Sequence, residues 1–230
     1  MSTPQLQRTK QRPRRPRALL AATVTTALAA AMAIASPWAP PTASAHGSVE
    51  DPLSRVYGCM LRWEYNWQDP IVEEQDPMCW AAWQANPNAM WGWSGLYREG
   101  TGGDFQAYIP DNQLCSAGHV WNSEFAAMDT PGPWLTTEVA EDFTVDVYDL
   151  ARHGADYLQV YVTEQGYDAQ TDALDWDDLE LVAETGRYEP SDHYTVDVSA
   201  PGRSGHHVVY TIWKASHHDQ IYFMCSDVTF

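Results

Sequence analysis

The chain is predicted to be an all-β protein, an antiparallel β-sandwich of the immunoglobulin-like or fibronectin III-like kind. A long tryptophan-rich, partly helical loop region is expected as an insertion near the N-terminus. Two observations predict this fold. The second half alternates apolar and polar residues with the period of half-buried strands, and turn residues separate the alternating stretches. Residues 56–103 instead show little alternation and carry six tryptophans, and a loop of that length is uncommon unless it is functional.

Residues 1–45 are predicted to be a secretory signal peptide that is removed. Six basic residues precede an alanine-rich apolar stretch, and Ala43-Ser44-Ala45 supplies the small residues that signal peptidase requires. The Arg14-Arg15 pair is compatible with twin-arginine export as well as with an ordinary secretory signal. Cleavage after Ala45 would make His46 the first residue of a secreted, extracellular protein.

The remaining 185 residues, 46–230, are enough for a single domain with a sizeable core. They carry seven basic and 31 acidic residues, hence a formal net charge of −24 with histidine neutral. A surface this acidic disfavours nucleic acid and anionic membranes as partners. We expect a monomer whose partner is uncharged.

The strands are expected along the second half of the chain. In "DFTVDVYDL" the residues Phe143, Val145 and Val147 share one face, and "DYLQVYVTEQGY" alternates in the same way. "HHVVYTIWKAS" and "IYFMCSDVTF" are rich in β-branched and aromatic residues. Glycines and Pro201-Gly202 supply the turns between them. In the loop region, "DPMCWAAWQAN" favours a short helix.

The four cysteines, Cys59, Cys79, Cys115 and Cys225, are an even number in an exported chain and lack CxxC spacing. They therefore indicate two disulfides rather than a metal cluster. Three pairings are possible. The pairing of Cys59 with Cys79 and of Cys115 with Cys225 would also tie the last strand to the middle of the domain.

A histidine at the first position of a mature chain offers two nitrogens to one ion, its α-amine and its ring Nδ1. The amine has to lose its proton to bind, and a strongly Lewis-acidic ion such as Cu(II) can displace that proton near neutral pH. A third nitrogen from another histidine would complete an all-nitrogen site suited to copper. A terminal histidine with no such role is the simpler alternative for His46 taken alone.

Five segments in order resemble the bacterial lytic polysaccharide monooxygenases of auxiliary activity family 10, also called chitin-binding type 4 domains. The likeness spans essentially the whole of residues 46–230. The segments that carry it are "HGSVEDPLSRVYGC", "IPDNQLCSAG", with Asn112 where the family has glycine, "LARHGADYLQVYVTEQGYD", "WDDLELV" and "YFMCSDVTF".

The resemblance implies a copper site held by the amine and Nδ1 of His46 and by His153. Ala151 matches the small residue that crowds one axial side of the metal. Tyr222 stands on the other axial side, where the family usually has phenylalanine, and Phe223 would take its place if the register slipped by one. Gln220 matches a Glu or Gln that positions the oxygen species, so the catalytic set is His46, His153, Tyr222 and Gln220.

Other residues of similar type carry weaker signals. Trp91 matches the exposed aromatic with which relatives touch polysaccharide, and a packed loop tryptophan is the alternative. Trp176 and Trp213 are expected in the core.

The other histidines are expected away from the site. His119 is expected in a solvated loop. The pairs His206-His207 and His217-His218 are expected at exposed strand edges, and His217 or His218 is a candidate to approach the site. His193 shows no pattern of its own. The carboxylates Asp175, Asp177, Asp178 and Glu180 lack the spacing of a hydrolytic pair, and a solvated strand end is expected.

The resemblance implies a copper-dependent monooxygenase or peroxygenase that oxidatively cleaves β-1,4 bonds in crystalline chitin, cellulose or both. Hydrogen abstraction is expected at C1, with C4 as the alternative, using O2 or H2O2 and an external small-molecule or protein electron donor. The competing interpretations are a non-catalytic chitin- or cellulose-binding protein of the same fold and a secreted copper carrier.

Overall fold

A computed structural model of the chain describes residues 46–64 and 66–230, so the predicted signal peptide lies outside the described residues. In chain order the elements are β1 (Gly47–Asp51), α1 (Arg55–Trp63), α2 (Ile71–Gln75), α3 (Pro77–Ala85), α4 (Asn88–Trp91), β2 (Tyr97–Glu99), α5 (Phe105–Tyr108), α6 (Val120–Ser123), η1 (Ala126–Asp129), β3 (Thr137–Glu138), β4 (Asp142–Asp149), β5 (Ala155–Thr163), η2 (Trp176–Asp178), β6 (Leu179–Glu184), β7 (His193–Ser199), β8 (His206–Ala215) and β9 (Gln220–Thr229). None of the helices in this part of the chain is both long and apolar enough to span a membrane.

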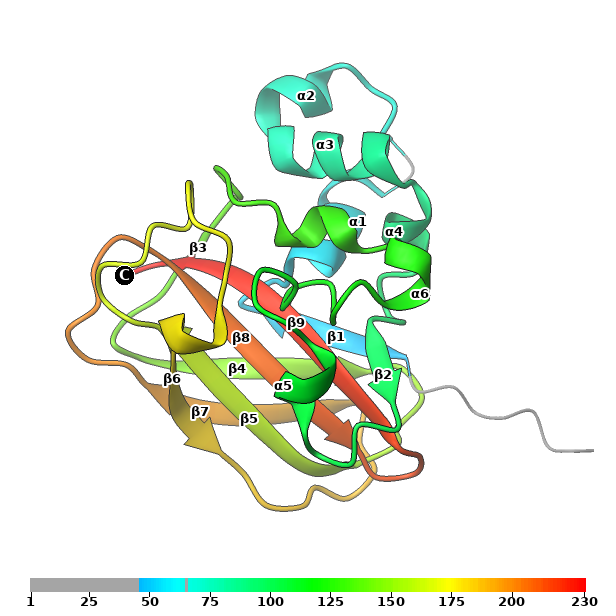
Figure 1. The fold of residues 1–230 in the computed structure, drawn as a ribbon, viewed down its shortest axis with the longest axis vertical. Coiled ribbons are helices and arrows are strands. Elements are labelled where there is room, and N and C mark those ends of the chain that lie inside the picture. The colour runs from blue at the N-terminus through cyan, green and yellow to red at the C-terminus, as the bar shows by residue number, and fades with distance from the viewer. Residues whose placement is uncertain (1–45, 65) are drawn as a thin grey trace, which may run out of the picture. The chain divides into compact units, whose positions relative to one another are not determined.

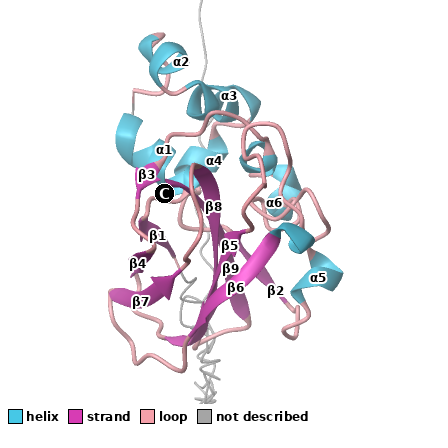
Figure 2. Cartoon of the chain, turned by 90° about the vertical axis from the view of Figure 1, so that its left-hand side faces the viewer, coloured by secondary structure: helices cyan, strands magenta, loops and turns pink. Residues whose placement is uncertain are grey.

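Two sheets form the sandwich that the sequence predicts. The smaller sheet has the order β1-β4-β7, and the larger has the order β2-β9-β8-β5-β6, with β3 added beside β9. The strands pair antiparallel except for β3, which runs parallel to β9. Figure 2 shows the sheets as two layers, with α1 to α4 gathered at one end and α5 and α6 on the outer side of the larger sheet. The prediction of an all-β sandwich with a helical insertion is therefore confirmed.

The first core lies between the two sheets. The alternation of β4 buries Val145 and Val147, as predicted, and β7 alternates in the same way with Tyr194, Val196 and Val198 inside. The inner faces of β5, β8 and β9 meet them across the sandwich. Burial contributes about 1.5–3 kcal/mol for each large apolar side chain in this layer.

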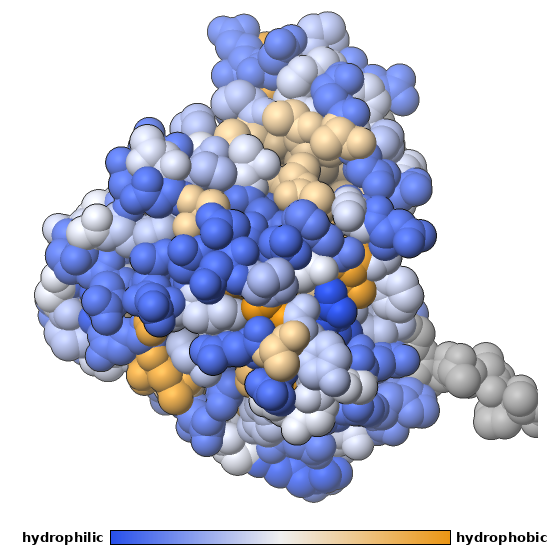
Figure 3. All heavy atoms as spheres, in the orientation of Figure 1, coloured by the Kyte–Doolittle hydropathy of each residue, from blue (hydrophilic) through white to orange (hydrophobic). Residues whose placement is uncertain are grey.

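A second core lies on the other side of the larger sheet, between β8 and β9 and the helical insertion (Figure 1). Tyr210, Ile212 and Phe223 point into this layer and meet Phe125 of the insertion region. Because β8 and β9 are covered on both faces, their burial is nearly continuous instead of alternating. In Figure 3 a group of apolar side chains reaches the surface over the helical region beside α3, and hydrophilic residues cover most of the remaining face.

One expectation about the histidines of β8 is wrong, because β8 lies inside the larger sheet between β9 and β5. His207 is buried, and its Nδ1 lies 2.9 Å from the Thr163 hydroxyl, while His206 is half-buried with Nε2 2.7 Å from an oxygen of Asp227. The pair His206-His207 is therefore not an exposed strand edge. Burial also lowers the pKa of His207 below its ordinary value, although its hydrogen bond to the Thr163 carbonyl acts in the opposite direction.

Covalent and ionic links attach the insertion to the sandwich. The disulfides are Cys59–Cys79, between α1 and α3, and Cys115–Cys225, which ties the segment after α5 to β9. The prediction of two disulfides is confirmed, and of the three possible pairings the local one is present. In addition, the buried guanidinium of Arg55 donates to both carboxylate oxygens of Asp227 on β9, at 2.7 and 3.0 Å. These links hold the loops that surround the N-terminal strand in a fixed position.

Candidate functional site

The site begins at His46, which directly precedes β1. Its carbonyl accepts a hydrogen bond from the Leu150 N–H at 2.8 Å, and its neighbour Gly47 pairs with Asp149 in the β1–β4 register. Gly47 has no room for a side chain, because an added Cβ would collide with the Tyr148 carbonyl and lie 2.8 Å from the Trp213 ring. Close packing at Gly47 therefore fixes where His46 lies.

The second predicted ligand, His153, lies in the turn after β4, and Asp149 fixes its orientation. The buried Asp149 carboxylate accepts from the His153 backbone N–H, lies 2.9 Å from His153 Nδ1, and accepts from Ala151 N at 3.1 Å and from the Tyr194 hydroxyl at 2.8 Å. Because Nδ1 is engaged, Nε2 is the ring nitrogen left for a metal. A carboxylate that holds a ligating imidazole in this way is the usual partner of a metal-binding histidine.

Two further histidines lie beside this turn. The ring of His217 stacks on His153, with centroids 3.7 Å apart and planes at 27°, and His218 contacts His217 at 4.3 Å. The expectation that one histidine of this pair approaches the site is therefore met by His217. Ala151 is exposed in the same turn, as a residue facing an open metal position would be.

Tyr222 of β9, and not Phe223, faces the sandwich core next to these residues. Tyr222 stacks on Trp213 at 4.5 Å and contacts Tyr97 at 5.2 Å, whereas Phe223 points into the opposite layer toward Phe105. The alternative register is therefore wrong. Burial raises the pKa of Tyr222, with smaller contributions from Tyr97 and from nearby carboxylates, so the protein environment keeps the phenol protonated.

Gln220 begins β9 two residues before Tyr222, so both side chains leave the strand on the same face. The Gln220 amide is buried and donates to Glu99 Oε1 at 2.8 Å, across the β2–β9 pairing that sets Glu99 opposite Gln220. The carboxylate of Glu99 thus fixes which way this amide points.

The surface next to His46 is a shallow hollow of about 300 Å³ whose lining includes Gly95, Tyr97, Trp121 and Glu124. The Trp121 ring meets Tyr97 edge-on at 5.2 Å and donates from Nε1 to the Gly95 carbonyl at 2.8 Å, yet Trp121 remains 47% exposed. An aromatic ring held rigidly at an open surface can stack on the C–H face of a sugar. Sequence reasoning missed Trp121.

Trp91 is the more exposed tryptophan, at 58%, which agrees with the expectation of a surface ring rather than a packed one. It lines a second hollow, of about 250 Å³, with Leu61, Met90 and Trp93, and Trp67 supports it edge-on at 4.9 Å. Gly92 follows Trp91 in the chain and lines the hollow beside His46. The two exposed tryptophans therefore stand on neighbouring hollows.

The donor set fits a copper ion. His153 Nε2 and the Tyr222 hydroxyl are buried and have no hydrogen-bond partner in the part of the chain that the structure describes. A buried imidazole nitrogen without a partner is costly unless a metal binds it, because its desolvation is otherwise uncompensated. Imidazole nitrogens and a deprotonated amine are donors that Cu(II) prefers. The amine of His46 depends on cleavage after Ala45, which lies outside the described residues.

The remaining candidates have structural roles. Asp175 and Asp178 form a capping box at η2, which gives two carboxylates of this acidic run a structural role. His119 is partly exposed and lies 3.4 Å from Asp129. Burial raises the pKa of Asp129 to about 6, against hydrogen bonds from Ser116 and the charge of His119. Trp213 is fully buried and Trp176 is packed against the core, as predicted.

Comparison with known proteins gives one family and several solved relatives. The family model described as lytic polysaccharide mono-oxygenase, cellulose-degrading, matches residues 46–228. The structure is similar to a crystal structure of a lytic polysaccharide monooxygenase from Kitasatospora papulosa, at 61% identity and a TM-score of 0.79, covering 80% of this chain and 98% of that one. It is also similar to the cellulose-active enzyme CelS2 in complex with copper, at 31% identity and a TM-score of 0.69, covering 80% and 98%.

Among the curated relatives, two match at an identity similar to that of CelS2. The chain is 32% identical to chitin-binding protein CbpD of Pseudomonas aeruginosa, over 83% of this chain and 49% of that protein. It is 32% identical to a lytic cellulose monooxygenase of Streptomyces ambofaciens, over 82% of this chain and 54% of that protein. The chain thus spans about half the length of these curated relatives.

Proposed function

The chain belongs to the lytic polysaccharide mono-oxygenase family, and on that basis we propose that it oxidatively cleaves β-1,4 bonds in crystalline cellulose, chitin or both. The observation that carries this proposal is the pair of histidines at the start of β1 and after β4, with Asp149 holding Nδ1 of His153 at 2.9 Å. Two of the similar proteins support this substrate class by their descriptions, one as a cellulose-active enzyme in complex with copper and the other as a chitin-binding protein.

The residues have the following proposed roles. After cleavage behind Ala45, the amine and Nδ1 of His46 and Nε2 of His153 would hold one copper ion. Copper, when bound, supplies the one-electron chemistry that activates O2 or H2O2, with electrons from an external donor. Asp149 keeps the imidazole of His153 in the tautomer that offers Nε2.

Tyr222 and Gln220 would act on the inner side of the ion. The buried, neutral phenol of Tyr222 excludes water from that side and, because burial raises its pKa, is not a strong anionic ligand. The amide of Gln220, oriented by Glu99, can hold a hydrogen bond to a polar oxygen atom beside the ion. Ala151, which is exposed in the turn before His153, would be the small residue that crowds the opposite side.

Trp91 and Trp121 would bind the polysaccharide. Both rings are exposed and lie on hollows that share the segment around Gly92, so a flat chain surface can contact both without entering a cleft. Stacking of this kind contributes about 0.5–1.5 kcal/mol beyond the buried area, or roughly three- to tenfold in affinity for each ring.

The protein would then be a secreted monomer that oxidises C1 of a sugar unit in an insoluble polysaccharide, with C4 as the alternative position. The test is mass spectrometry of the soluble products released from cellulose and from chitin by the chain that begins at His46, with copper and ascorbate. Aldonic acid oligosaccharides from one polymer identify the substrate, and gem-diol or ketone products identify C4 oxidation. His153→Ala is the control and should release none.

The name of CbpD favours a second candidate, a binding protein without oxidative activity. Tight binding to chitin or cellulose without any oxidised product would support that candidate and overturn the enzyme. Trp121→Ala separates a substrate contact from a structural role. It should weaken binding roughly three- to tenfold with the copper spectrum unchanged, whereas Leu181→Ala, an exposed apolar residue on the far edge strand β6, should not.

A further inference from the structure

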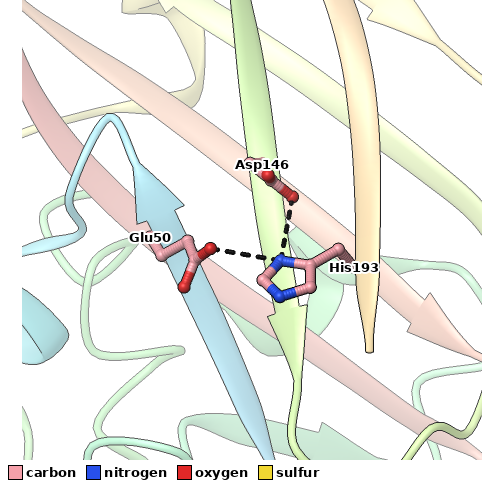
Figure 4. A group of neighbouring side chains, drawn as sticks. All are labelled: Glu50, Asp146 and His193. Carbon is pink, nitrogen blue, oxygen red and sulfur yellow. Dashed lines mark ion pairs between the residues drawn. The ribbon is translucent and has the colours of Figure 1, made fainter. Parts of the chain in front are cut away.

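Three metal-binding side chains from three strands meet on the outer face of the smaller sheet (Figure 4). Glu50 comes from β1, Asp146 from β4 and His193 from the first position of β7. Nδ1 of His193 lies 3.1 Å from Oε1 of Glu50 and 3.5 Å from Oδ1 of Asp146, and the three ligand atoms all lie within 4.8 Å of one another. This donor set is separate from that of His46 and His153.

The sheet itself brings these residues together. Asp146 alternates with the buried Val145 and Val147, so its side chain faces outward. A register shift between Val49 and Asp51 leaves Glu50 at a bulge opposite this part of β4, and a bulge re-aims the side chain that it carries. Three strands thus contribute one donor each.

The imidazole of His193 is held in place from one side. The Tyr148 ring, directly across the β4–β7 register, lies against it with centroids 5.3 Å apart and planes at 31°. Figure 4 shows Nδ1 directed between the two carboxylates. Nδ1 of His193 is therefore already directed toward the carboxylates of Glu50 and Asp146.

The charge of the group is unbalanced. Within residues 46–64 and 66–230, neither Glu50 nor Asp146 forms an ion pair with a lysine or an arginine, and His193 is the partner of both. Oδ1 of Asp146 is buried and has no hydrogen-bond partner in the same residues. Two adjacent carboxylates concentrate negative charge at this point, which favours a bound cation.

We propose that Glu50, Asp146 and His193 form a second metal site, for a borderline divalent ion of the Zn²⁺ class. One imidazole nitrogen and two carboxylate oxygens are ligands that Zn²⁺ accepts, with water completing a four-coordinate site. Ca²⁺ and Mg²⁺ prefer oxygen ligands alone, and the imidazole disfavours them. A bound ion would join β1, β4 and β7, and so anchor the strand that begins directly after His46.

The test is isothermal titration of Zn²⁺ into tag-free protein that begins at His46 and has been loaded with one equivalent of copper, so that the first site is filled. One Zn²⁺ per chain should bind and raise the melting temperature. His193→Gln and Glu50→Gln should each weaken binding at least tenfold. His119→Gln, which removes another partly exposed histidine beside a carboxylate, should bind as the unchanged protein does.

Melting curves without metal check that each variant folds, and Glu50→Gln changes only a partly exposed side chain at a bulge. The proposal is overturned if the copper-loaded protein binds no further Zn²⁺, or if His193→Gln binds it with unchanged affinity. It is also overturned if the NMR signals of the His193 ring change with pH but not on addition of Zn²⁺. The three side chains would then form only an ion pair between the His193 imidazolium and the two carboxylates.

Discussion

Replacing Asp149 with asparagine tests how the site holds its second histidine. Oδ1 of Asp149 serves His153 Nδ1 and the Ala151 N–H, and Oδ2 serves the His153 N–H and the Tyr194 hydroxyl. An amide has one oxygen, so its NH2 group must face one of these backbone N–H donors whichever way it turns. At least one charge-assisted hydrogen bond is lost, worth about 1.5–3 kcal/mol of the free energy of unfolding.

The same substitution should weaken copper binding. Loss of an orienting partner typically costs ten- to a hundredfold in metal affinity, because the ligating ring is no longer held in position. Urea denaturation of the metal-free variant measures the stability change, and a competition titration with a chelator measures the affinity. Tyr194→Phe is the matched control: it removes one partner of Asp149 and the acceptor of the buried Gly154 N–H, should lose about 1–3 kcal/mol of stability, and should keep its copper affinity within about twofold. An asparagine variant with unchanged stability and affinity would refute the role of Asp149.

Three further substitutions have definite expected outcomes. Gly47→Ala should shift the start of β1, because the new methyl group would press on the Trp213 ring, and should change the Cu(II) spectrum while a melting curve falls by several degrees. Asp129→Asn should stabilise the protein by about 3 kcal/mol at pH 7 and not at all below pH 4. Because the pKa of the native carboxyl is raised to about 6, ionising Asp129 costs the folded state stability as the pH rises from 4 to 6 and above. A stability difference between variant and unchanged protein that is the same at pH 4 and pH 7 in urea denaturation would contradict this. Arg55→Ala should cost about 3–5 kcal/mol by leaving Asp227 buried without its main cation, a loss that Asp227→Ala in the same protein should partly restore.

The fold was predictable to the extent that local pattern determines it. The alternation of β4 determines which face is buried, because the apolar Val145 and Val147 pack in the core while the polar residue between them faces outward. The even number of exported cysteines likewise predicted two disulfides, although spacing alone left their pairing open. Strand β7 was not predicted, although its residues alternate as clearly as those of β4.

The burial of the histidine pair in β8 could not be read from the strand alone. His207 is buried because its side chain lies on the inner face of β8 with Val209 and Trp213, where its ring meets Phe230 edge-on at 5.5 Å. Tertiary packing of this kind overrides the preference of a polar residue for the surface. The nearly continuous burial of β8 and β9 has a separate cause, because the insertion covers the outer face of these two strands.

The site was only partly predictable for a similar reason. His46 and His153 carry signals of their own, one from its place behind Ala45 and one from the segment around it. Asp149 does not, since any strand end can carry an aspartate, and its role depends on a turn that returns His153 to it. Trp121 is exposed and lies in a segment with a left-handed backbone conformation, at φ of 53°, which no local motif predicts.

The most direct test of the central claim is the electron paramagnetic resonance spectrum of the protein with one equivalent of Cu(II), recorded for two forms of the chain. The form that begins at His46 should show coupling to three nitrogens, from the amine and ring of His46 and the ring of His153. A form with one additional residue before His46 should lose the amine nitrogen and bind copper more weakly. Identical spectra and affinities for the two forms would contradict the claim.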